Sequence, residues 1–296
     1  MADDTLVLLV GHGTVSDLDQ LPEFLKRIRR GRPAPEELVS EMRHRYSAIG
    51  GSPLLRITEE QAQGLSDRLG LPCRVVMRFW SPTLDEVIGE LSGYRRLLVL
   101  PMAPFSVHIY SAVIRDALAT LAEQGRHVPE LVAVEPYGED PAFVAATSAL
   151  VARSLADLNC HTDTPLILTA HSLPLMVLRS GDPYADLFSA SAGAIGERLD
   201  RTTLLAYQSQ GASGGEWLGP ALEDVLRTAA EHNSTGQVAI APVGFVADHV
   251  ETLFDLDIEA RGWAKDLGLE LLRVPAHNTD GAFLDALAEV VRRALH

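Results

Sequence analysis

The chain has 296 residues, of which 47% are apolar and 22% charged, as is typical of a globular protein with a sizeable core. Its formal net charge of −15 argues against a nucleic-acid partner, because phosphate repulsion would need a strong local basic patch to overcome it. Its two cysteines lie far apart and form no CxxC pair, which indicates neither a disulfide framework nor a cysteine-bound zinc or iron–sulfur site.

The first residues, MADDTLVLLVGHGT, lack the basic-then-apolar layout of a secretory signal. No apolar run in the chain approaches the roughly 18–20 residues of a membrane-spanning helix. We therefore expect a cytoplasmic protein without a transmembrane segment.

Short apolar runs alternate with amphipathic stretches through the first half of the chain. Four runs predict strands: 5–13, 73–79, 96–104 and 131–137. Between them, SDLDQLPEFLKRIRRG and TEEQAQGLSDRLG place apolar residues at helical spacing and end at glycine. Because each run is short and almost continuously apolar, this half predicts a parallel sheet that helices cover on both faces.

A second series of runs follows, at 164–174, 202–211, 236–245 and 269–278, and the stretch DGAFLDALAEVVRRAL predicts a final helix. The pattern predicts an α/β fold of two Rossmann-like, doubly wound domains, residues 1–145 and 146–296, whose final helix could pack back on the first domain. In such sheets, ligands bind beyond the carboxyl ends of the strands. This rule directs attention to His12, His171, 208–210 and 244–251.

Two histidines follow predicted strands directly. His171, in LTAHSLP, either hydrogen-bonds a nearby backbone group or places an imidazole of near-neutral pKa where it can bind a metal or accept a proton. His12 lies between two glycines in GHGT, which indicates either a tight turn or a close backbone approach to a ligand. The third glycine of a dinucleotide fingerprint is missing, so the GxG signal for a phosphate site is weak.

Arg29 and Arg30 belong to the basic cluster IRRGR in an otherwise acidic chain. A basic helix end explains the cluster, because cations favour a helix C-terminus, and an anionic small molecule bound by arginine forks explains it equally well. Trp217, in the glycine-rich stretch EWLGP, is either a core anchor or a flat face for a planar ligand.

Glu251, Asp255 and Glu259 recur every fourth residue in GFVADHVETLFDLDIEA (244–260), which reads as a helix. On a helix they would form one column of like charges that repel one another, with His249 beside it. A solvated face would explain the column. Because the segment follows a predicted strand directly, a cation-binding face would explain it as well, since divalent cations relieve the repulsion and carboxylates can carry protons away.

Several motifs resemble those of ferrochelatases, and they occur in the family's order along nearly the whole chain. These are RYSAIGGSPL (45–54), ITEEQA (57–62), AHSLP (170–174), YQSQG (207–211), WLGP (217–220) and PVGFVADHVETLFDLDIEA (242–260). The stretch IRRGRPAPEELVSEMRHRYSAIGG is most similar to the coproporphyrin III ferrochelatases of Gram-positive-type bacteria. The resemblance implies two Rossmann-like domains around a porphyrin cleft.

The resemblance also implies roles for single residues. His171 and Glu251 would be catalytic, facing the porphyrin centre, where they deliver the metal and remove the two pyrrole protons. Asp255 and Glu259 would line an outer path that can hold a divalent cation. Substrate binding would fall to Arg29, Arg30, Arg45, Ser52, Ser209 and Trp217.

One departure from the family pattern concerns His12, which stands where coproporphyrin-type relatives usually have a tyrosine that can ligate iron. His12 could do the same through nitrogen. The small cobalt and nickel chelatases of the same superfamily also have a metal-binding histidine at this position, so insertion of Co²⁺ or Ni²⁺ into another tetrapyrrole is an alternative.

The resemblance therefore predicts a monomeric lyase of haem biosynthesis that inserts Fe²⁺ into coproporphyrin III. Protoporphyrin IX is the alternative porphyrin, and a non-catalytic tetrapyrrole or metal carrier is an alternative of another class. Fe²⁺ would be a substrate, no cofactor would be bound permanently, and two cysteines are too few for the family's iron–sulfur cluster.

Overall fold

Two four-stranded parallel sheets, each in its own compact unit, organise the computed structural model, which describes residues 4–91, 93–211, 215–231 and 233–296. The first unit comprises Met1–Asp140 with Asn278–His296, and the second comprises Pro141–His277. From the sequence we expected the boundary after residue 145, whereas the units divide after Asp140 and the final helix belongs to the first unit. The two α/β sheets confirm the predicted fold class.

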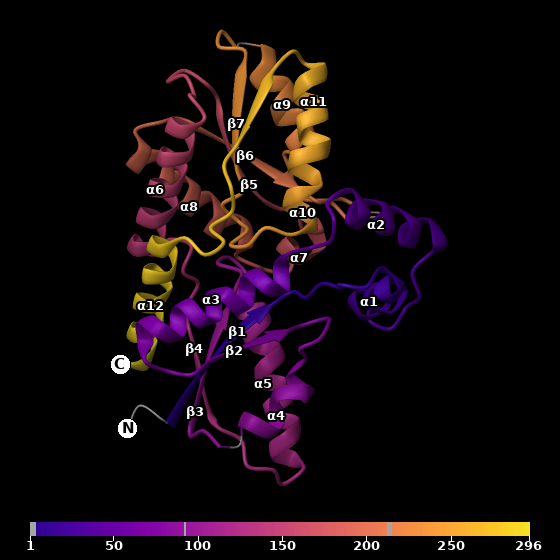
Figure 1. The fold of residues 1–296 in the computed structure, drawn as a ribbon, viewed down its shortest axis with the longest axis vertical. Coiled ribbons are helices and arrows are strands. Elements are labelled where there is room, and N and C mark those ends of the chain that lie inside the picture. Colours follow the sequence, from indigo (N-terminus) through magenta and orange to yellow (C-terminus); the bar gives the residue numbers. More distant parts are fainter. Residues whose placement is uncertain (1–3, 92, 212–214, 232) are drawn as a thin grey trace. The chain divides into compact units, whose positions relative to one another are not determined.

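The first unit contains a sheet in the order β2-β1-β3-β4 (Figure 1). Its strands are β1 (Thr5–Gly11), β2 (Cys73–Met77), β3 (Arg96–Pro101) and β4 (Glu130–Ala133). Its helices are α1 (Leu21–Ile28), α2 (Glu36–Ala48), α3 (Leu54–Leu69), α4 (Leu84–Leu91), α5 (Val107–Glu123) and α12 (Gly281–Leu295), with a short 3₁₀ turn, η2 (Leu18–Gln20). All seven residues of β1 are buried, as expected of a central strand covered on both faces.

The second unit repeats this strand order as β6-β5-β7-β8. Its strands are β5 (Leu166–His171), β6 (Thr203–Gln208), β7 (Gln237–Ala241) and β8 (Glu270–Arg273). Its α-helices are α6 (Pro141–Asp157), α7 (Leu175–Arg179), α8 (Tyr184–Leu199), α9 (Leu222–Glu231), α10 (Val250–Leu253) and α11 (Arg261–Asp266). Helices α9 and α11 cover one face of the sheet, and α6 packs beside α8 on the other (Figure 1).

The order second-first-third-fourth gives each sheet a switch point, where ligands of open α/β sheets bind. In the first unit it lies between β1 and β3, and in the second between β5 and β7. His12 directly follows β1, and His171 is the last residue of β5. The two histidines therefore occupy corresponding places in the two sheets.

The acidic segment 244–260 differs from the continuous helix that its spacing predicts. Helix α10 begins only at Val250, after an extended His249 whose N–H donates to the Thr252 hydroxyl at 3.0 Å. A π-helix, η3 (Asp255–Ala260), follows, because the Phe254 carbonyl accepts from the N–H groups of both Ile258 and Glu259. The prediction of one straight acidic column is therefore wrong. Asp255 is buried, whereas Glu259 is partly exposed.

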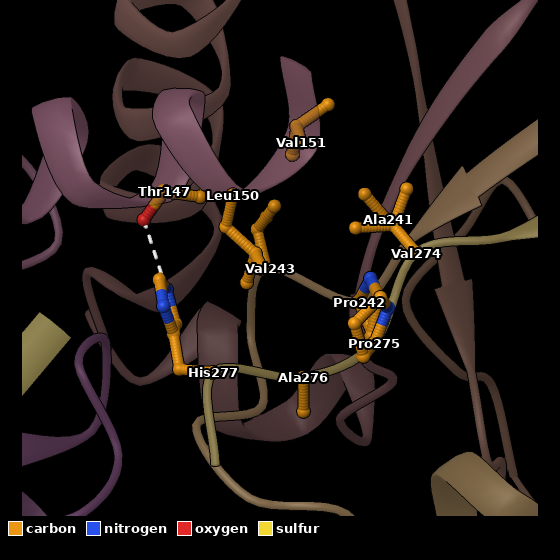
Figure 2. A pocket seen from close by; sticks show the side chains of 10 residues that line it. All are labelled: Thr147, Leu150, Val151, Ala241, Pro242, Val243, Val274, Pro275, Ala276 and His277. Atoms are coloured by element: carbon orange, nitrogen blue, oxygen red, sulfur yellow. Dashed lines mark hydrogen bonds between the residues drawn. The ribbon is translucent and has the colours of Figure 1, made fainter. Parts of the chain in front are cut away.

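His277 ends the second unit in a buried position beside a small, mainly apolar pocket. Its Nε2 lies 3.0 Å from the Thr147 hydroxyl of α6, and that hydroxyl donates to the Phe143 carbonyl, so Nε2–H is the donor (Figure 2). The pocket walls are Leu150, Val151, Ala241, Pro242, Val243, Val274, Pro275 and Ala276. His277 therefore anchors the segment after β8 to α6.

Among the residues that the structure describes, no helix is long and apolar enough to cross a membrane.

Candidate active site

The candidate site of the second unit lies at the carboxyl edge of its sheet, where β5 ends in His171. The segment after β7 passes directly over this edge, and the Gly244 N–H donates to the Thr169 carbonyl at 3.0 Å. A Cβ on Gly244 would lie 2.7 Å from the Ala170 Cβ and 2.8 Å from its Cα. Only glycine allows so close an approach, so this contact sets the path of the chain toward His249 and Glu251.

Three side chains meet at this edge. The Nε2 atom of His171 lies 3.4 Å from the Oε2 atom of Glu251, and the Nε2 atom of His249 lies 3.5 Å from the same oxygen. The Phe245 ring is near both imidazoles, with centroid distances of 6.5 Å to His171 and 5.3 Å to His249. The structure thus brings together the two predicted catalytic residues and adds His249 to them.

Hydrogen bonds to the backbone orient both imidazoles. His171 Nδ1 donates to the Ser172 carbonyl, and His249 Nδ1 donates to the Ala247 carbonyl at 3.0 Å. A carbonyl oxygen only accepts, so the Nδ1 atom carries a proton in each ring. The Nε2 atoms of both rings face the Glu251 carboxylate.

The His171–Glu251 contact shifts both pKa values. Burial opposes the charged imidazole, but attraction to Glu251, the hydrogen bonds of the ring and the charge of Asp255 outweigh it, so the pKa of His171 rises above its usual 6.5. Burial likewise opposes the Glu251 carboxylate, yet His171 and His249 hold its pKa well below 4.5. Each group therefore favours the charged form of the other.

Polar side chains of β5 and β6 fix the position of α10 and η3. Gln208 Nε2 donates to the Glu251 backbone carbonyl at 2.7 Å, while its Oε1 accepts from the Thr169 hydroxyl at 2.7 Å. The next residue, Ser209, donates from its hydroxyl to the buried Asp255 carboxylate and has a left-handed backbone with φ of 61°. Ser209 and Asp255, both expected at the site, are therefore in direct contact.

Glu259 and Trp217 lie further along the second unit. Glu259 is partly exposed on η3. Trp217 is partly buried and forms an isolated antiparallel bridge with Pro174, and its ring packs so close to Gly211 that a Cβ there would lie 2.8 Å away. Within the described ranges, no three His, Cys, Asp or Glu side chains are grouped so that they could hold a metal ion by themselves.

In the first unit, His12 is exposed at the carboxyl end of β1. Its Nδ1 atom lies 3.4 Å from the Tyr110 hydroxyl, and its ring meets Phe79 edge-on at 4.8 Å. The Arg78 guanidinium lies over the Phe79 ring at 4.8 Å and over the Tyr110 ring at 5.6 Å. His12 is thus held in an aromatic and cationic setting at the switch point of this sheet.

The other predicted substrate-binding residues of this unit lie on and between its first helices. Arg29 caps the C-terminus of α1, and Arg30 follows it with a left-handed backbone. Arg45, on α2, pairs with Glu41 at 2.7 Å. Ser52 lies between α2 and α3, where its hydroxyl is 3.5 Å from the Leu54 N–H.

Sequence reasoning assigned no role to Phe79, Tyr110, Asp248 or Arg273. Asp248 directly precedes His249 in the sequence DHVE (248–251), and Arg273 ends β8. The strand-end rule did not single out Arg273, because the predicted run 269–278 extends past the actual end of β8. Nothing in the local pattern marks Phe79 or Tyr110, because their contacts with His12 depend on the pairing of β1 with β2 and on the packing of α5.

Comparisons with known proteins identify relatives of the chain over its whole length. The family model described as Ferrochelatase matches residues 4–295. The Ferrochelatase of Acidobacterium capsulatum is 33% identical over 316 residues, which cover 100% of this chain and 96% of that protein. The Coproporphyrin III ferrochelatase of Geobacillus thermodenitrificans is 32% identical over 314 residues, covering 100% and 98% of the two chains.

Among solved structures, CbiX, the terminal enzyme for biosynthesis of siroheme in denitrifying bacteria, shares the fold, with a TM-score of 0.60 at 16% identity. That match covers 98% of this chain and 99% of CbiX. The two parallel sheets thus define a chelatase-like α/β protein.

The chain belongs to the ferrochelatase family. This confirms the resemblance and the expected enzyme class, a lyase of haem biosynthesis for which ferrous iron and a porphyrin are substrates.

Proposed function

We propose that the chain inserts Fe²⁺ into coproporphyrin III and releases the two pyrrole protons, with His171 and Glu251 as its catalytic pair. The observation that carries the proposal is the 3.4 Å contact between His171 Nε2 and Glu251 Oε2 at the switch point of the second sheet. The name of the Geobacillus thermodenitrificans relative, Coproporphyrin III ferrochelatase, supports this choice of porphyrin. Protoporphyrin IX is the alternative substrate.

The first pyrrole proton passes to Glu251. A protonated His171 has no lone pair with which to accept a proton, whereas the carboxylate oxygens of Glu251 can accept one. His249 Nε2, 3.5 Å from the same carboxylate, then offers an onward route. The low pKa of Glu251 makes its neutral form short-lived, so the proton is passed on and the carboxylate is regenerated.

Iron and the proton compete for His171. A metal binds the deprotonated Nε2, so His171 could bind Fe²⁺ only after its Nε2 proton has passed to Glu251 or to water. Because few protein ligands converge on this edge, iron keeps water ligands or gains porphyrin nitrogens as it leaves solution. Asp255 and Glu259 lead outward from Glu251 along η3, and we assign them to the iron or proton path, with an outer divalent-cation site as its entrance.

In the first unit, we assign His12 as a further metal ligand and three arginines as propionate-binding residues. His12 contributes a nitrogen ligand, oriented by the Tyr110 hydroxyl and the Phe79 ring. Arg29, Arg30 and Arg45 bind propionates, which suits coproporphyrin III because it carries more propionates than protoporphyrin IX. We also assign Ser52, Ser209 and Trp217 to substrate binding, as the family resemblance implies.

We further propose that no iron–sulfur cluster and no permanent cofactor is bound, and that the enzyme is a cytoplasmic monomer. The chain has two cysteines, and burial raises the pKa of one of them, Cys73, to about 12, which disfavours the thiolate that a cluster requires.

Anaerobic incubation of the purified protein with each porphyrin and each metal tests the proposal. The visible spectrum should report metalloporphyrin formation fastest for Fe²⁺ with coproporphyrin III. No product above the uncatalysed rate would overturn the catalytic assignment and favour a non-catalytic carrier. Faster insertion into protoporphyrin IX would overturn the choice of porphyrin.

One observation favours a second function, insertion of Co²⁺ or Ni²⁺. The imidazole of His12 is a nitrogen ligand that suits nickel and cobalt as well as iron. Insertion of cobalt without insertion of iron would establish this alternative.

A further inference from the structure

Arg273 is a cation at the carboxyl end of β8 whose side chain is only 9% exposed. One terminal nitrogen, Nη2, lies 2.8 Å from Asp248 Oδ1, and Nε lies 3.4 Å from Asp257 Oδ1. The other, Nη1, donates to the Val274 carbonyl. The guanidinium plane is thereby fixed between two carboxylates.

These two carboxylates delimit the segment that carries the catalytic groups. Asp248 immediately precedes His249, and Asp257 lies within the π-helix η3. Between them lie His249, Glu251 and Asp255. Arg273, hydrogen-bonded to Asp248 and ion-paired with Asp257, therefore connects the two ends of segment 248–257 to β8, the edge strand of the sheet.

The Asp248 contact continues into α10. The Thr252 hydroxyl donates to Asp248 Oδ1 at 2.9 Å and also accepts from the His249 N–H at 3.0 Å. Asp248 thus accepts one hydrogen bond from Arg273 of β8 and another from Thr252 of α10. These hydrogen bonds of Asp248 set the rotation of the first turn of α10, which carries Glu251.

The residue type matters as well as the charge. An arginine side chain presents N–H groups in one plane and in several directions, which suits hydrogen bonds to Asp248 and the Val274 backbone together with the ion pair to Asp257. A lysine ammonium is a point charge on a flexible stem and fixes a direction less well.

We propose that Arg273 is a positioning residue for metal insertion: it holds both ends of segment 248–257 and so keeps the Glu251 carboxylate between the imidazoles of His171 and His249. The inference rests on the proposed roles of His171 and Glu251. Arg273 itself touches no reacting group.

The test compares variants that remove the clamp with one that removes a neighbouring charge. R273M deletes the clamp and leaves two carboxylates without their buried cation. D248N/R273M deletes it and also removes one of those charges, which guards against misfolding. R273K keeps the charge but not the planar fork. R261M is the matched control: Arg261 is exposed, donates to the backbone carbonyls of Asp257 and Leu271, and approaches only Asp257, at 3.9 Å, of the two clamped carboxylates.

Each variant is examined by anaerobic steady-state kinetics, by porphyrin binding from fluorescence quenching, and by hydrogen exchange of the α10 amides. R273M and D248N/R273M should lose on the order of tenfold to hundredfold in kcat, as expected for a displacement of about 1 Å at a reacting group. Porphyrin affinity should stay near that of the wild type, while the amides of Leu253 and Phe254 exchange faster and those of β5 do not. R273K should recover part of kcat, and R261M should match the wild type.

Wild-type kcat and wild-type α10 exchange in folded D248N/R273M would overturn the role of Arg273 and leave the proposed function intact. A loss in R273M that vanishes in D248N/R273M would also overturn it, because the uncompensated charge alone would then be responsible. Absence of turnover in the wild type would instead overturn the proposed function, and this inference with it.

Discussion

The Nε2 atom of His171 lies 3.4 Å from the Oε2 atom of Glu251, although 80 positions separate the two residues in the sequence. One ends the first strand of the second sheet, and the other opens the helix that follows its third strand. In the sheet order β6-β5-β7-β8 these strands are neighbours, so the topology creates the pair. Each group has a shifted pKa because of the other, which makes the pair accessible to measurement.

The pair should contribute a pH-dependent part of stability. The pKa of His171 is raised in the folded state, so its contribution is complete below its unfolded value of 6.5 and is lost as the pH rises through the folded value. The pKa of Glu251 is lowered, so its contribution is complete above 4.5 and is lost as the pH falls through the folded value. The two contributions therefore coincide between pH 4.5 and 6.5.

Urea unfolding of the wild type and of H171N/E251Q over a series of pH values measures this contribution. The difference in unfolding free energy between the two proteins should be greatest within that window and smaller on either side. A difference that does not vary with pH would show that the pair does not titrate as described.

Substitutions at Ser209 should separate a hydrogen bond from backbone strain. S209A removes the hydroxyl that donates to the buried Asp255 carboxylate, and it should lower the unfolding free energy by about 1–3 kcal/mol. S209G removes the same donor but suits the φ of 61°, so its loss should be about 1 kcal/mol smaller. Chemical unfolding gives both values, and equal or larger destabilisation by glycine would argue against strain at this position.

Gly244 should tolerate no side chain. In G244A the new methyl would meet Ala170 at 2.7–2.8 Å, partly against its backbone, and should cost about 1–3 kcal/mol of stability as well as lowering kcat by displacing the segment before His249. The control is G262A on α11, where a Cβ meets no atom within 4 Å and helix propensity should add about 0.5–1 kcal/mol. A stable, fully active G244A would show that this close approach does not determine the site.

Replacing His12 should change metal preference or product release rather than abolish the reaction. In H12Y a phenol oxygen replaces the imidazole nitrogen, and we expect retained turnover with a changed visible spectrum of the bound product and a changed rate of product release or metal preference. Stopped-flow absorbance follows product release, and the same assay with Co²⁺ measures metal preference. Complete inactivity of H12Y would mean that His12 is essential and not a replaceable ligand.

Much of the fold could be predicted because its strands are short, nearly continuous apolar runs. All eight predicted runs overlap a strand, although each run extends beyond the carboxyl end of its strand, where apolar residues such as Met102 and Ala103 continue into the loop. The strand-end rule then singled out His12, His171 and residues 244–251 without any knowledge of distances.

The details of the site could not be predicted in the same way. Periodicity predicts one uniform helix for segment 244–260. The π-helix instead depends on the Phe254 carbonyl, which accepts hydrogen bonds from two N–H groups. The clamp by Arg273 depends on β8 lying beside β7, so no local pattern marks it. The coupling of His249 to Glu251 likewise follows from the extended backbone at His249.

The most direct test of the account is the turnover of E251Q and H171A with Fe²⁺ and coproporphyrin III under anaerobic conditions, with porphyrin affinity measured in parallel. Glutamine keeps the shape of Glu251 but cannot accept a proton, and alanine removes the imidazole, so each variant should lose roughly a hundredfold or more in kcat while still binding porphyrin. Near-wild-type turnover in both variants would contradict the central claim that His171 and Glu251 perform the proton and metal exchange.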